Sequence, residues 1–307
     1  MMSFIEKLIN SILDKKSVVC MGLDPRLEKE GEIPQYLIKN LEEPNKIILE
    51  FNKSLIDEAC DLIPVIKPQI AFYEKYDVLN SLKETIQYAH KKDLLVILDS
   101  KRNDIGTTSK AYADSTFNIY QPDACTLNGY LGIDSIKPYL DYYSNKGIFV
   151  LVKTSNPSSS EFQDLFSIKL GEVDEKITEV QRENVKLERN YIQMAKLINS
   201  WNENLQLFSN YSNLGAVVGA TFPNQLKKIR KIIPHSFILI PGYGAQGATS
   251  KDIVNGFDSE GLGAIVNSSR GIIFAYNKDK KYSPSQFDKA ARAEIEQMNE
   301  SINKMIF

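Results

Sequence analysis

Short, almost uninterrupted apolar runs recur along the chain, separated by longer polar and amphipathic segments. The runs cover residues 17–24, 63–69, 94–101, 124–130, 147–155, 215–221, 236–242 and 263–269. Continuous apolar runs are typical of strands that are covered on both faces, whereas strands with one face in water alternate. The pattern therefore predicts eight buried strands in a parallel sheet.

The segments between these runs have the periodicity of amphipathic helices, most clearly at 45–60, 76–92 and 223–233. Eight strand–helix units over about 250 residues fit an α/β fold of the (β/α)8 TIM-barrel type. A doubly wound open sheet is the alternative. We expect residues 1–307 to form a single TIM-barrel catalytic domain with an insertion at about 156–212. The high charge of this insertion favours a solvated excursion on the barrel flank, with a lid as the alternative.

Composition narrows the range of partners. The 307 residues carry a formal net charge of −2, which gives no global attraction to nucleic acid or to an anionic membrane. No apolar run approaches the roughly 18 residues of a membrane-spanning helix, and the segment 4–16 is amphipathic and charged, unlike a secretory signal. These features predict a cytoplasmic protein with a small-molecule partner.

Cysteine and histidine are scarce and scattered. Cys20, Cys60 and Cys125 lie in apolar stretches without a Cys-x-x-Cys spacing, so we expect thiols in the core. His90 and His235 have no carboxylate or cysteine neighbours at metal-ligand spacing. The sequence thus disfavours a zinc site and a histidine-based catalytic triad.

Polar residues mark the carboxyl ends of the predicted strands, where the active sites of TIM barrels lie. These residues are Asp24, Lys67, Gln69, Asp99, Lys101, Asn128, Lys153, Thr154, Ser155, Thr221, Asn267 and Arg270. Charged groups at the same end of several separate strands indicate a site rather than chance exits from the core.

The densest charge lies in the stretch LVILDSKRNDIGTT at 95–108. Asp99 and Lys101 are two residues apart on a strand and should share a face, while Arg102 should point the opposite way. Lys67 ends the neighbouring strand, and Asp104 follows on a loop. An ordinary solvated ion-pair network is the alternative interpretation. At a partly desolvated barrel mouth, however, these charges would interact strongly.

A second cluster suggests phosphate binding. The segment PGYGAQGAT at 241–249 and the segment NSSRG at 267–271 follow the last two predicted strands, the usual phosphate-binding place in this barrel. The glycines of the segment 241–249 let backbone N–H groups approach an anion closely. Gln246 adds an amide donor, and Arg270 adds a cation that can form two hydrogen bonds to the anion.

Together the two clusters restrict the chemistry. Carboxylate neighbours should favour the ammonium forms of Lys67 and Lys101, so Lys101 is suited to donate a proton. Holding a substrate carboxylate near Asp99, with an ammonium near the carbon that loses CO2, would favour a transition state in which charge moves onto carbon.

On these residues the sequence resembles the orotidine 5′-phosphate decarboxylase family. The shared pattern is Lys67 with Asp99-x-Lys101-x-x-Asp104-Ile105-x-x-Thr108 and the glutamine-containing phosphate loop. Further matching segments are GLDPR at 22–26, IKPQIAFYE at 66–74, VKTSNP at 152–157, GATFP at 219–223 and VNSSRG at 266–271. The insertion resembles that of the longer branch of the family. Ala248 departs from the commonest form of the loop.

The resemblance implies decarboxylation of orotidine 5′-phosphate to uridine 5′-phosphate and CO2, the last step of de novo UMP synthesis, with no metal or organic cofactor. It makes Lys67, Asp99, Lys101 and Asp104 the catalytic charge network, with Lys101 protonating C6 of the pyrimidine. It further implies a homodimer in which the partner supplies Asp104, with Ile105 and Thr108 beside it. The other implied substrate contacts are Asp24 to the ribose, Ser155 and Pro241 to the pyrimidine, and Tyr243, Gln246 and Arg270 to the phosphate.

Two rival functions remain. A related phosphosugar decarboxylase or synthase would use the Asp-x-Lys-x-x-Asp core around magnesium and would lose activity on chelation. A nucleotide-binding sensor on an inactive barrel would be expected to lack part of the Lys-Asp-Lys-Asp set, which is complete here.

Overall fold

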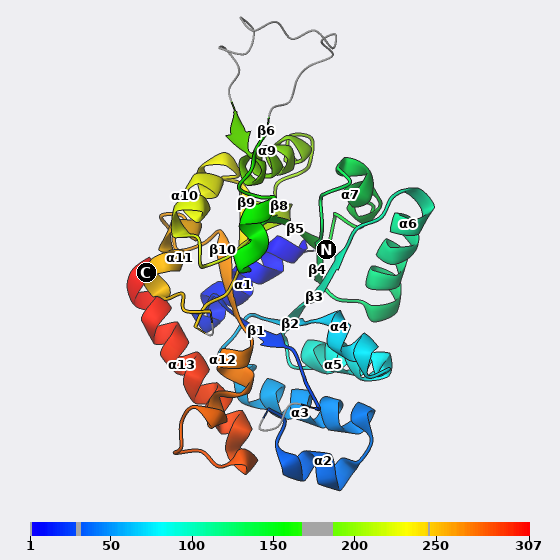
Figure 1. Ribbon diagram of the computed structural model, residues 1–307, viewed down its shortest axis with the longest axis vertical. Coiled ribbons are helices and arrows are strands. Elements are labelled where there is room, and N and C mark those ends of the chain that lie inside the picture. Colours follow the sequence, from blue (N-terminus) through cyan, green and yellow to red (C-terminus); the bar gives the residue numbers. More distant parts are fainter. Residues whose placement is uncertain (1, 29–31, 168–186, 245) are drawn as a thin grey trace, which may run out of the picture.

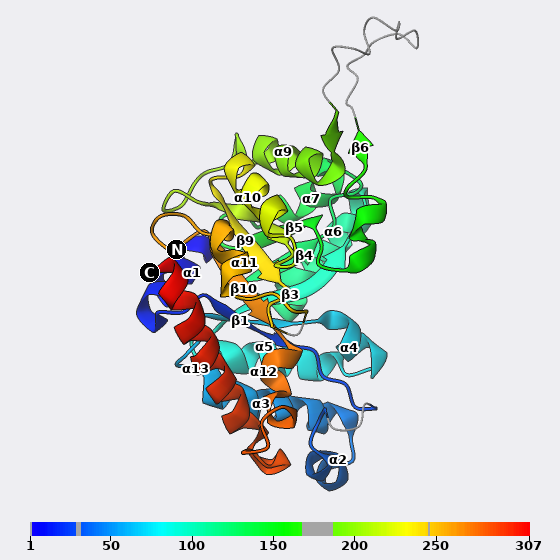
Figure 2. The ribbon, with the colours of Figure 1, turned by 60° about the vertical axis from the view of Figure 1, so that its left-hand side comes forward.

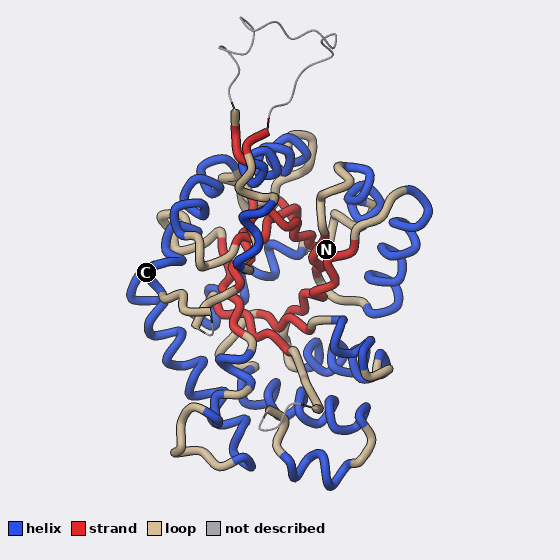
Figure 3. The backbone as a smooth tube through the Cα atoms, viewed as in Figure 1, coloured by secondary structure: helices blue, strands red, loops and turns tan. Residues whose placement is uncertain are grey.

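Eight parallel strands close into a barrel in the computed structural model, which describes residues 2–28, 32–167, 187–244 and 246–307. Figure 3 shows the strands as a ring enclosed by helices. Around the ring the strands run β1-β10-β9-β8-β5-β4-β3-β2. Barrel strands that follow one another in the chain are therefore neighbours, and β10 closes the ring against β1. Their bounds are β1 Val19–Leu23, β2 Val65–Pro68, β3 Leu95–Arg102, β4 Ala124–Leu127, β5 Gly147–Lys153, β8 Ser212–Val218, β9 Ser236–Pro241 and β10 Ala264–Ser268. The closed ring confirms the (β/α)8 barrel and rules out the open sheet.

Helices surround the barrel (Figures 1 and 2). The α-helices are α1 Phe4–Lys15, α2 Gln35–Leu41, α3 Pro44–Ala59, α4 Ile70–Lys75, α5 Leu79–Lys91, α6 Gly106–Asp114, α7 Ile133–Leu140, α9 Asn190–Asn202, α10 Pro223–Ile232, α11 Ser250–Ile253, α12 Arg270–Ile273 and α13 Phe287–Ile306. Short π or 3₁₀ turns are η1 Ser115–Tyr120, η2 Pro157–Glu161, η3 Val254–Gly256, η4 Ala275–Asn277 and η5 Pro284–Gln286. The expected helices at 45–60, 76–92 and 223–233 correspond to α3, α5 and α10. None of the described helices is both long and apolar enough to cross a membrane.

Helix α1 lies against the amino end of the barrel. Phe4 packs edge-on against Phe149 of β5, with ring centroids 6.0 Å apart. A Cβ atom at Gly147 would lie 2.2 Å from the Phe4 ring, so the first residue of β5 must be glycine for α1 to pack this closely. The backbone N–H of Ile5 also donates to Asn213 Oδ1 over 3.0 Å. This end is therefore closed, which leaves the carboxyl end for the site.

The sixth barrel strand begins earlier than the apolar run predicted. Strand β8 starts at Ser212 rather than at 215, and Ser212 and Asn213 are both buried. Their polar atoms are bonded inside the protein: Ser212 Oγ donates to Asn202 Oδ1, and Asn213 Nδ2 donates to the Tyr143 carbonyl. Polar residues with such partners can be buried at little net cost, so hydropathy alone misses them.

Residues 154–211 separate β5 from β8, and the insertion is expected at about 156–212, a range whose last residue is the first residue of β8. The first described part is η2, followed by strand β6 Phe166–Ser167, which pairs antiparallel with β7 Glu188–Arg189. Helix α9 follows directly and packs against β5 and β8, so it serves as the crossover helix between them. Residues 168–186, where most of the charged run falls, lie outside the described residues.

The prediction of three core thiols holds for two of them. Cys20 and Cys125 are buried, whereas Cys60 is only half-buried. Cys60 is the residue that caps the carboxyl end of α3, one position after the last buried residue of that helix, Ala59. Its thiol lies 3.6 Å from the Asp57 carbonyl and packs against the edge of the core, where it stays partly exposed.

An ion pair near the amino ends of the strands predicts how stability depends on pH. His90 Nε2 lies 2.9 Å from Asp123 Oδ2, which also accepts the Val96 N–H over 2.9 Å. Burial alone would raise the pKa of Asp123, but the bond to His90, its charge and the Val96 N–H lower it below the usual value. A carboxyl with a depressed pKa stabilises the fold above its unfolded pKa, and this contribution is lost as the pH falls through the folded pKa.

We therefore expect Asp123→Asn to lower the free energy of unfolding at pH 7 by about 1–3 kcal/mol. The difference from the unsubstituted protein should shrink below about pH 4, where the carboxyl group is protonated first in the unfolded chain and, at lower pH, in the folded protein as well. Urea unfolding at pH 7 and pH 3 would measure both values, with Asp14→Asn on the exposed face of α1 as the control. An equal loss at the two pH values would contradict the assignment.

Candidate functional site

Three charged side chains meet at the carboxyl ends of β2 and β3. Lys67 Nζ donates to Asp99 Oδ2 over 2.8 Å, and Lys101 Nζ donates to Asp99 Oδ1 over 2.5 Å. Lys67 and Asp99 are only 4% and 6% exposed, whereas Lys101 is exposed toward the mouth. The Asp99 carboxylate is thus held between two ammonium groups, one buried and one accessible.

Two neutral side chains complete the shell of Asp99. Thr126 Oγ1 in β4 donates to Asp99 Oδ1 over 2.7 Å, and Gln69 Nε2 donates to Oδ2 over 3.1 Å. The sequence marks Gln69 only as a polar strand end, and it does not single out Thr126. The available signal for Thr126 was its position as the one polar residue within the apolar run Ala124–Leu127.

The backbone of β3 is distorted at this point. Its pairing with β4 shifts register between Leu98 and Arg102, and Lys101 has a φ of +47°. A left-handed conformation costs a non-glycine residue about 1–3 kcal/mol. The Thr126 hydroxyl offsets part of this cost, since it accepts the N–H groups of Ser100 and Lys101. The predicted shared face of Asp99 and Lys101 is observed, although a distorted strand rather than regular alternation produces it.

The pKa values follow from this arrangement. Burial alone would raise the pKa of Asp99, but the charges of Lys67 and Lys101 outweigh it and hold the pKa far below the usual range. Burial opposes the ammonium form of Lys67, but Asp99 and then Asp24 overcome it and raise its pKa. Asp99 is therefore an anion and Lys67 a cation at neutral pH.

A cavity of about 170 Å³ opens beside this cluster, between β1, β9 and β10. It is lined by Asp24, Lys67, Asp99, Pro241, Gly242, Tyr243, Gln246, Asn267, Ser268, Ser269 and Arg270. Gly242, Gly244 and Gly247 have φ values of +100°, +71° and +90°, conformations that suit glycine and give the loop its turns. With Gln246 and Arg270 on its wall, this cavity offers amide and guanidinium donors suited to an anion.

A second cavity, of about 300 Å³, adjoins the first and shares Lys67, Asp99 and Pro241 with it. Its other lining residues are Lys101, Thr126, Leu151, Thr154, Ser155, Asn156, Val217 and Leu239. The charged side chains of Lys67, Asp99 and Lys101 come from β2 and β3, and the aliphatic side chains of Leu151, Val217 and Leu239 come from β5, β8 and β9. The two cavities therefore form one elongated site, with an anion-binding end, a charged middle and a largely apolar end.

Asp24 has an unsatisfied oxygen in this site. Its Oδ1 atom is buried and has no hydrogen-bond partner within the described part of the chain. A buried carboxylate oxygen without a partner is costly, so a donor such as a ligand hydroxyl group would be stabilising here.

The structure brings together the catalytic and substrate-contact residues implied by the family resemblance, except Asp104, Ile105 and Thr108. Of the other polar strand ends, Asn128 lines a separate cavity, and Lys153 and Thr221 line neither part of the site. Asp104 Oδ1 accepts the Ile105 N–H over 2.9 Å and forms no ion pair with Lys67 or Lys101 of its own chain. Ile105 is 54% exposed and lines an open groove with Lys110 and Lys137. Arg102 points away from the site, as expected, and pairs with Glu74.

Among the described residues, no group of three or more His, Cys, Asp and Glu side chains is placed to hold a metal ion. The fold and the site define an enzyme of the TIM-barrel class in which charged groups gather at the carboxyl ends of the strands.

Comparison with known proteins identifies the family within this class. Residues 17–283 match the model of the orotidine 5′-phosphate decarboxylase / HUMPS family. An orotidine 5′-phosphate decarboxylase from Petrotoga mobilis is 40% identical over 97% of each chain. One from Rhodopirellula baltica is 39% identical over 98% of this chain and 99% of its own. The solved structure of the OMP decarboxylase of Leishmania donovani aligns with a TM-score of 0.71 at 29% identity, over 97% of this chain and 99% of that one.

The chain belongs to the orotidine 5′-phosphate decarboxylase / HUMPS family. Its curated relatives bear the name of a carboxy-lyase of pyrimidine biosynthesis, and the chain is accordingly a decarboxylase. The family resemblance seen in the sequence motifs is confirmed over nearly the whole length.

Proposed function

We propose that this chain converts orotidine 5′-phosphate to uridine 5′-phosphate and CO2, the last step of de novo UMP synthesis. The observation that carries the proposal is the Asp99 carboxylate, held between Lys67 and Lys101 in the middle of the elongated site. The names and close similarity of the curated relatives support the substrate. The site fits its three parts: a phosphate, a sugar and a planar base that carries a carboxylate.

Each end of the site has a role in this proposal. Tyr243, Gln246 and Arg270 bind the phosphate at the anion-binding end. Asp24 accepts a ribose hydroxyl through its unpartnered Oδ1 atom. Ser155 and Pro241 contact the pyrimidine ring in the largely apolar cavity. Binding energy from the phosphate, which does not react, helps to hold the base against the charges.

The charged middle performs the chemistry. Asp99 stands opposite the substrate carboxylate and opposes its negative charge, which at about 4 Å and an effective dielectric near 20 is worth about 4 kcal/mol. This repulsion is relieved as the C6–carboxylate bond breaks and CO2 leaves. The electron pair left on C6 is stabilised by the Lys101 ammonium, which then donates its proton to C6. The reaction in this form uses side chains alone, without a metal or an organic cofactor.

We further propose that the active enzyme is a homodimer. Asp104 forms no ion pair with either lysine of its own chain, and Ile105 beside it is largely exposed. In the dimer, Asp104, Ile105 and Thr108 would enter the site of the partner, where Asp104 would complete the alternating Lys-Asp-Lys-Asp network.

Loss of orotidine 5′-phosphate absorbance tests the proposed reaction. We expect the purified protein to consume the substrate and release CO2 at the same rate in excess EDTA as without it. The distinction from a magnesium-dependent relative is sharp, because chelation would stop that reaction. No turnover under either condition, or turnover only without EDTA, would overturn the proposal.

A further inference from the structure

A fully buried lysine lies beside the apolar end of the site, and the proposed reaction does not use it. Lys153, the last residue of β5, has no exposed surface. Its Nζ atom donates to Asp164 Oδ2 and to Ser159 Oγ, both over 2.9 Å, and lies 4.3 Å from the centroid of the Phe222 ring. Burying an ammonium group costs several kcal/mol unless it is well paired, so this contact is specific rather than incidental.

A second set of contacts fastens the same segment to the end of β5. The Gln163 side chain accepts the N–H of Thr154 over 2.9 Å and donates to the Thr154 hydroxyl over 2.8 Å. Arg189 Nη1 donates to the Asp164 carbonyl over 2.6 Å. The segment 157–164 is thus bonded to β5 through Lys153 and Thr154, and to the insertion through Arg189.

These contacts lie directly behind one wall of the substrate cavity. Thr154, Ser155 and Asn156 line the largely apolar cavity and follow Lys153 without a break. On the other side, a Cβ atom at Gly219 would come within 2.8 Å of Ser155 Cα, so the wall also packs tightly against the end of β8. The backbone of the wall is therefore held between Gly219 and the segment 157–164.

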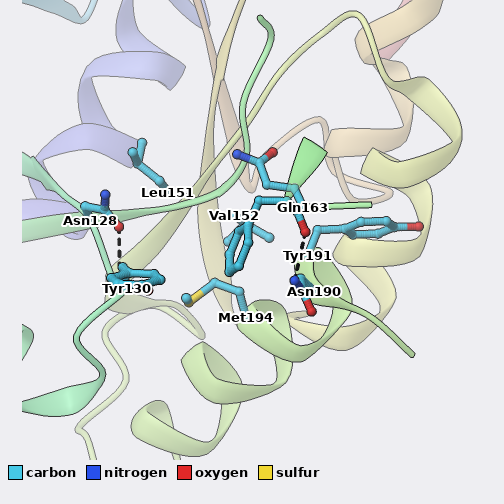
Figure 4. A pocket seen from close by; sticks show the side chains of 9 residues that line it. Asn128, Tyr130, Leu151, Val152, Gln163, Asn190, Tyr191 and Met194 are labelled. Atoms are coloured by element: carbon cyan, nitrogen blue, oxygen red, sulfur yellow. Dashed lines mark hydrogen bonds between the residues drawn. The ribbon is translucent and has the colours of Figure 1, made fainter. Parts of the chain in front are cut away.

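A further cavity, of about 170 Å³, lies beside this wall, and its lining includes Gln163 together with Tyr191 and Met194 of helix α9 (Figure 4). The Met194 side chain points toward Tyr130, whereas the Tyr191 ring points away from it. Leu151 of β5 lines both this cavity and the substrate cavity. The Leu151 side chain therefore separates the insertion from the base end of the site.

We propose that Lys153, through its buried contact with Asp164, is a positioning residue that holds the wall 154–156 against the base of the substrate. This inference rests on the proposed function, because it assigns the base to the largely apolar cavity. Lys153 does not touch the substrate; it determines where Ser155 stands. The phosphate end is built on β9 and β10 instead, so loss of the ion pair should affect the base and leave phosphate binding intact.

Lys153→Met tests the proposal by separating the two ends of the site. We expect kcat/KM for orotidine 5′-phosphate to fall by about 10–100-fold, because displacement of a positioning group by about 1 Å has effects of this size. The dissociation constant of uridine 5′-phosphate, measured by calorimetry, should rise in parallel. The inhibition constant of inorganic phosphate should change less than about twofold, and Lys153→Arg, which can keep the pair with Asp164, should restore most of the loss.

Lys146→Met is the matched control, since Lys146 lies just before the amino end of β5 and donates to the Pro122 carbonyl over 2.7 Å. It should lower the melting temperature without changing either ligand constant. Should Lys153→Met fail to fold, Gln163→Leu removes both bonds to Thr154 while keeping the ion pair, and should shift the constants in the same direction.

Unchanged binding of uridine 5′-phosphate in a folded Lys153→Met protein would overturn the inference, as would an equal weakening of phosphate and nucleotide. A wild-type protein that binds uridine 5′-phosphate but does not decarboxylate would instead refute the proposed function, and the binding comparison would still test the role of Lys153.

Discussion

Lys101→Ala is expected to lower kcat/KM for decarboxylation by at least about 10³-fold, because a proton donor and a stabilising charge are lost together. Lys101 Nζ lies 2.5 Å from Asp99 and is the exposed member of the pair of lysines that flank it. Its removal also leaves the Asp99 anion with only one cation. Single-turnover measurements of absorbance loss, with enzyme in excess, would determine the rate even if turnover is very slow.

The fold of the variant must be shown to be intact for this result to concern chemistry. Lys101 projects into the mouth of the barrel, so its truncation should change the melting temperature little. Lys227→Ala, on the exposed face of helix α10, is the matched control and should retain full activity. If Lys101→Ala kept more than about a tenth of the wild-type rate, another group would have to supply the proton.

The barrel could be predicted because its strands are buried on both faces. Runs such as residues 94–101 and 236–242 have too many successive apolar residues for an edge or a solvated face, and their regular alternation with helical patterns leaves few topologies. The charge cluster could be predicted for a related reason. Lys67, Asp99 and Lys101 interrupt apolar runs at the same end, and parallel strands bring those ends together.

What the sequence did not reveal depends on contacts between distant residues. The burial of Ser212 depends on Asn202 and Tyr143, which no local pattern connects to it. The role of Thr126 depends on the register shift that brings its hydroxyl to Asp99 and to the distorted backbone at Lys101. In both cases a polar residue within an apolar run is stabilised by a hydrogen-bond partner that is distant in the sequence. A hydropathy pattern shows the polar residue but not its partner, so it cannot predict the role of that residue.

The proposed role of Asp104 leads to an experiment whose outcome depends on the dimer. Asp104→Ala alone should be nearly inactive, because the network of the partner's site loses its second carboxylate. Lys101→Ala alone should be nearly inactive through its own site. A heterodimer of the two variants would have one site with both defects and one site with neither.

Mixing the two inactive variants under conditions of subunit exchange should therefore restore activity. With equal amounts and random pairing, half of the dimers are heterodimers and each has one intact site, so roughly a quarter of the wild-type activity should return. The recovery should rise with the fraction of heterodimer, measured by native mass spectrometry on a tagged subunit. The matched control is a mixture of Lys101→Ala and Lys67→Ala. Both lysines contact Asp99 of their own chain, so each subunit of this mixture carries the defect in its own site. An intact Asp104 from the partner cannot repair such a site, and activity should stay near zero. Heterodimers that form without any recovery would show that Asp104 serves its own chain, and the exposed position of Ile105 would then need another explanation.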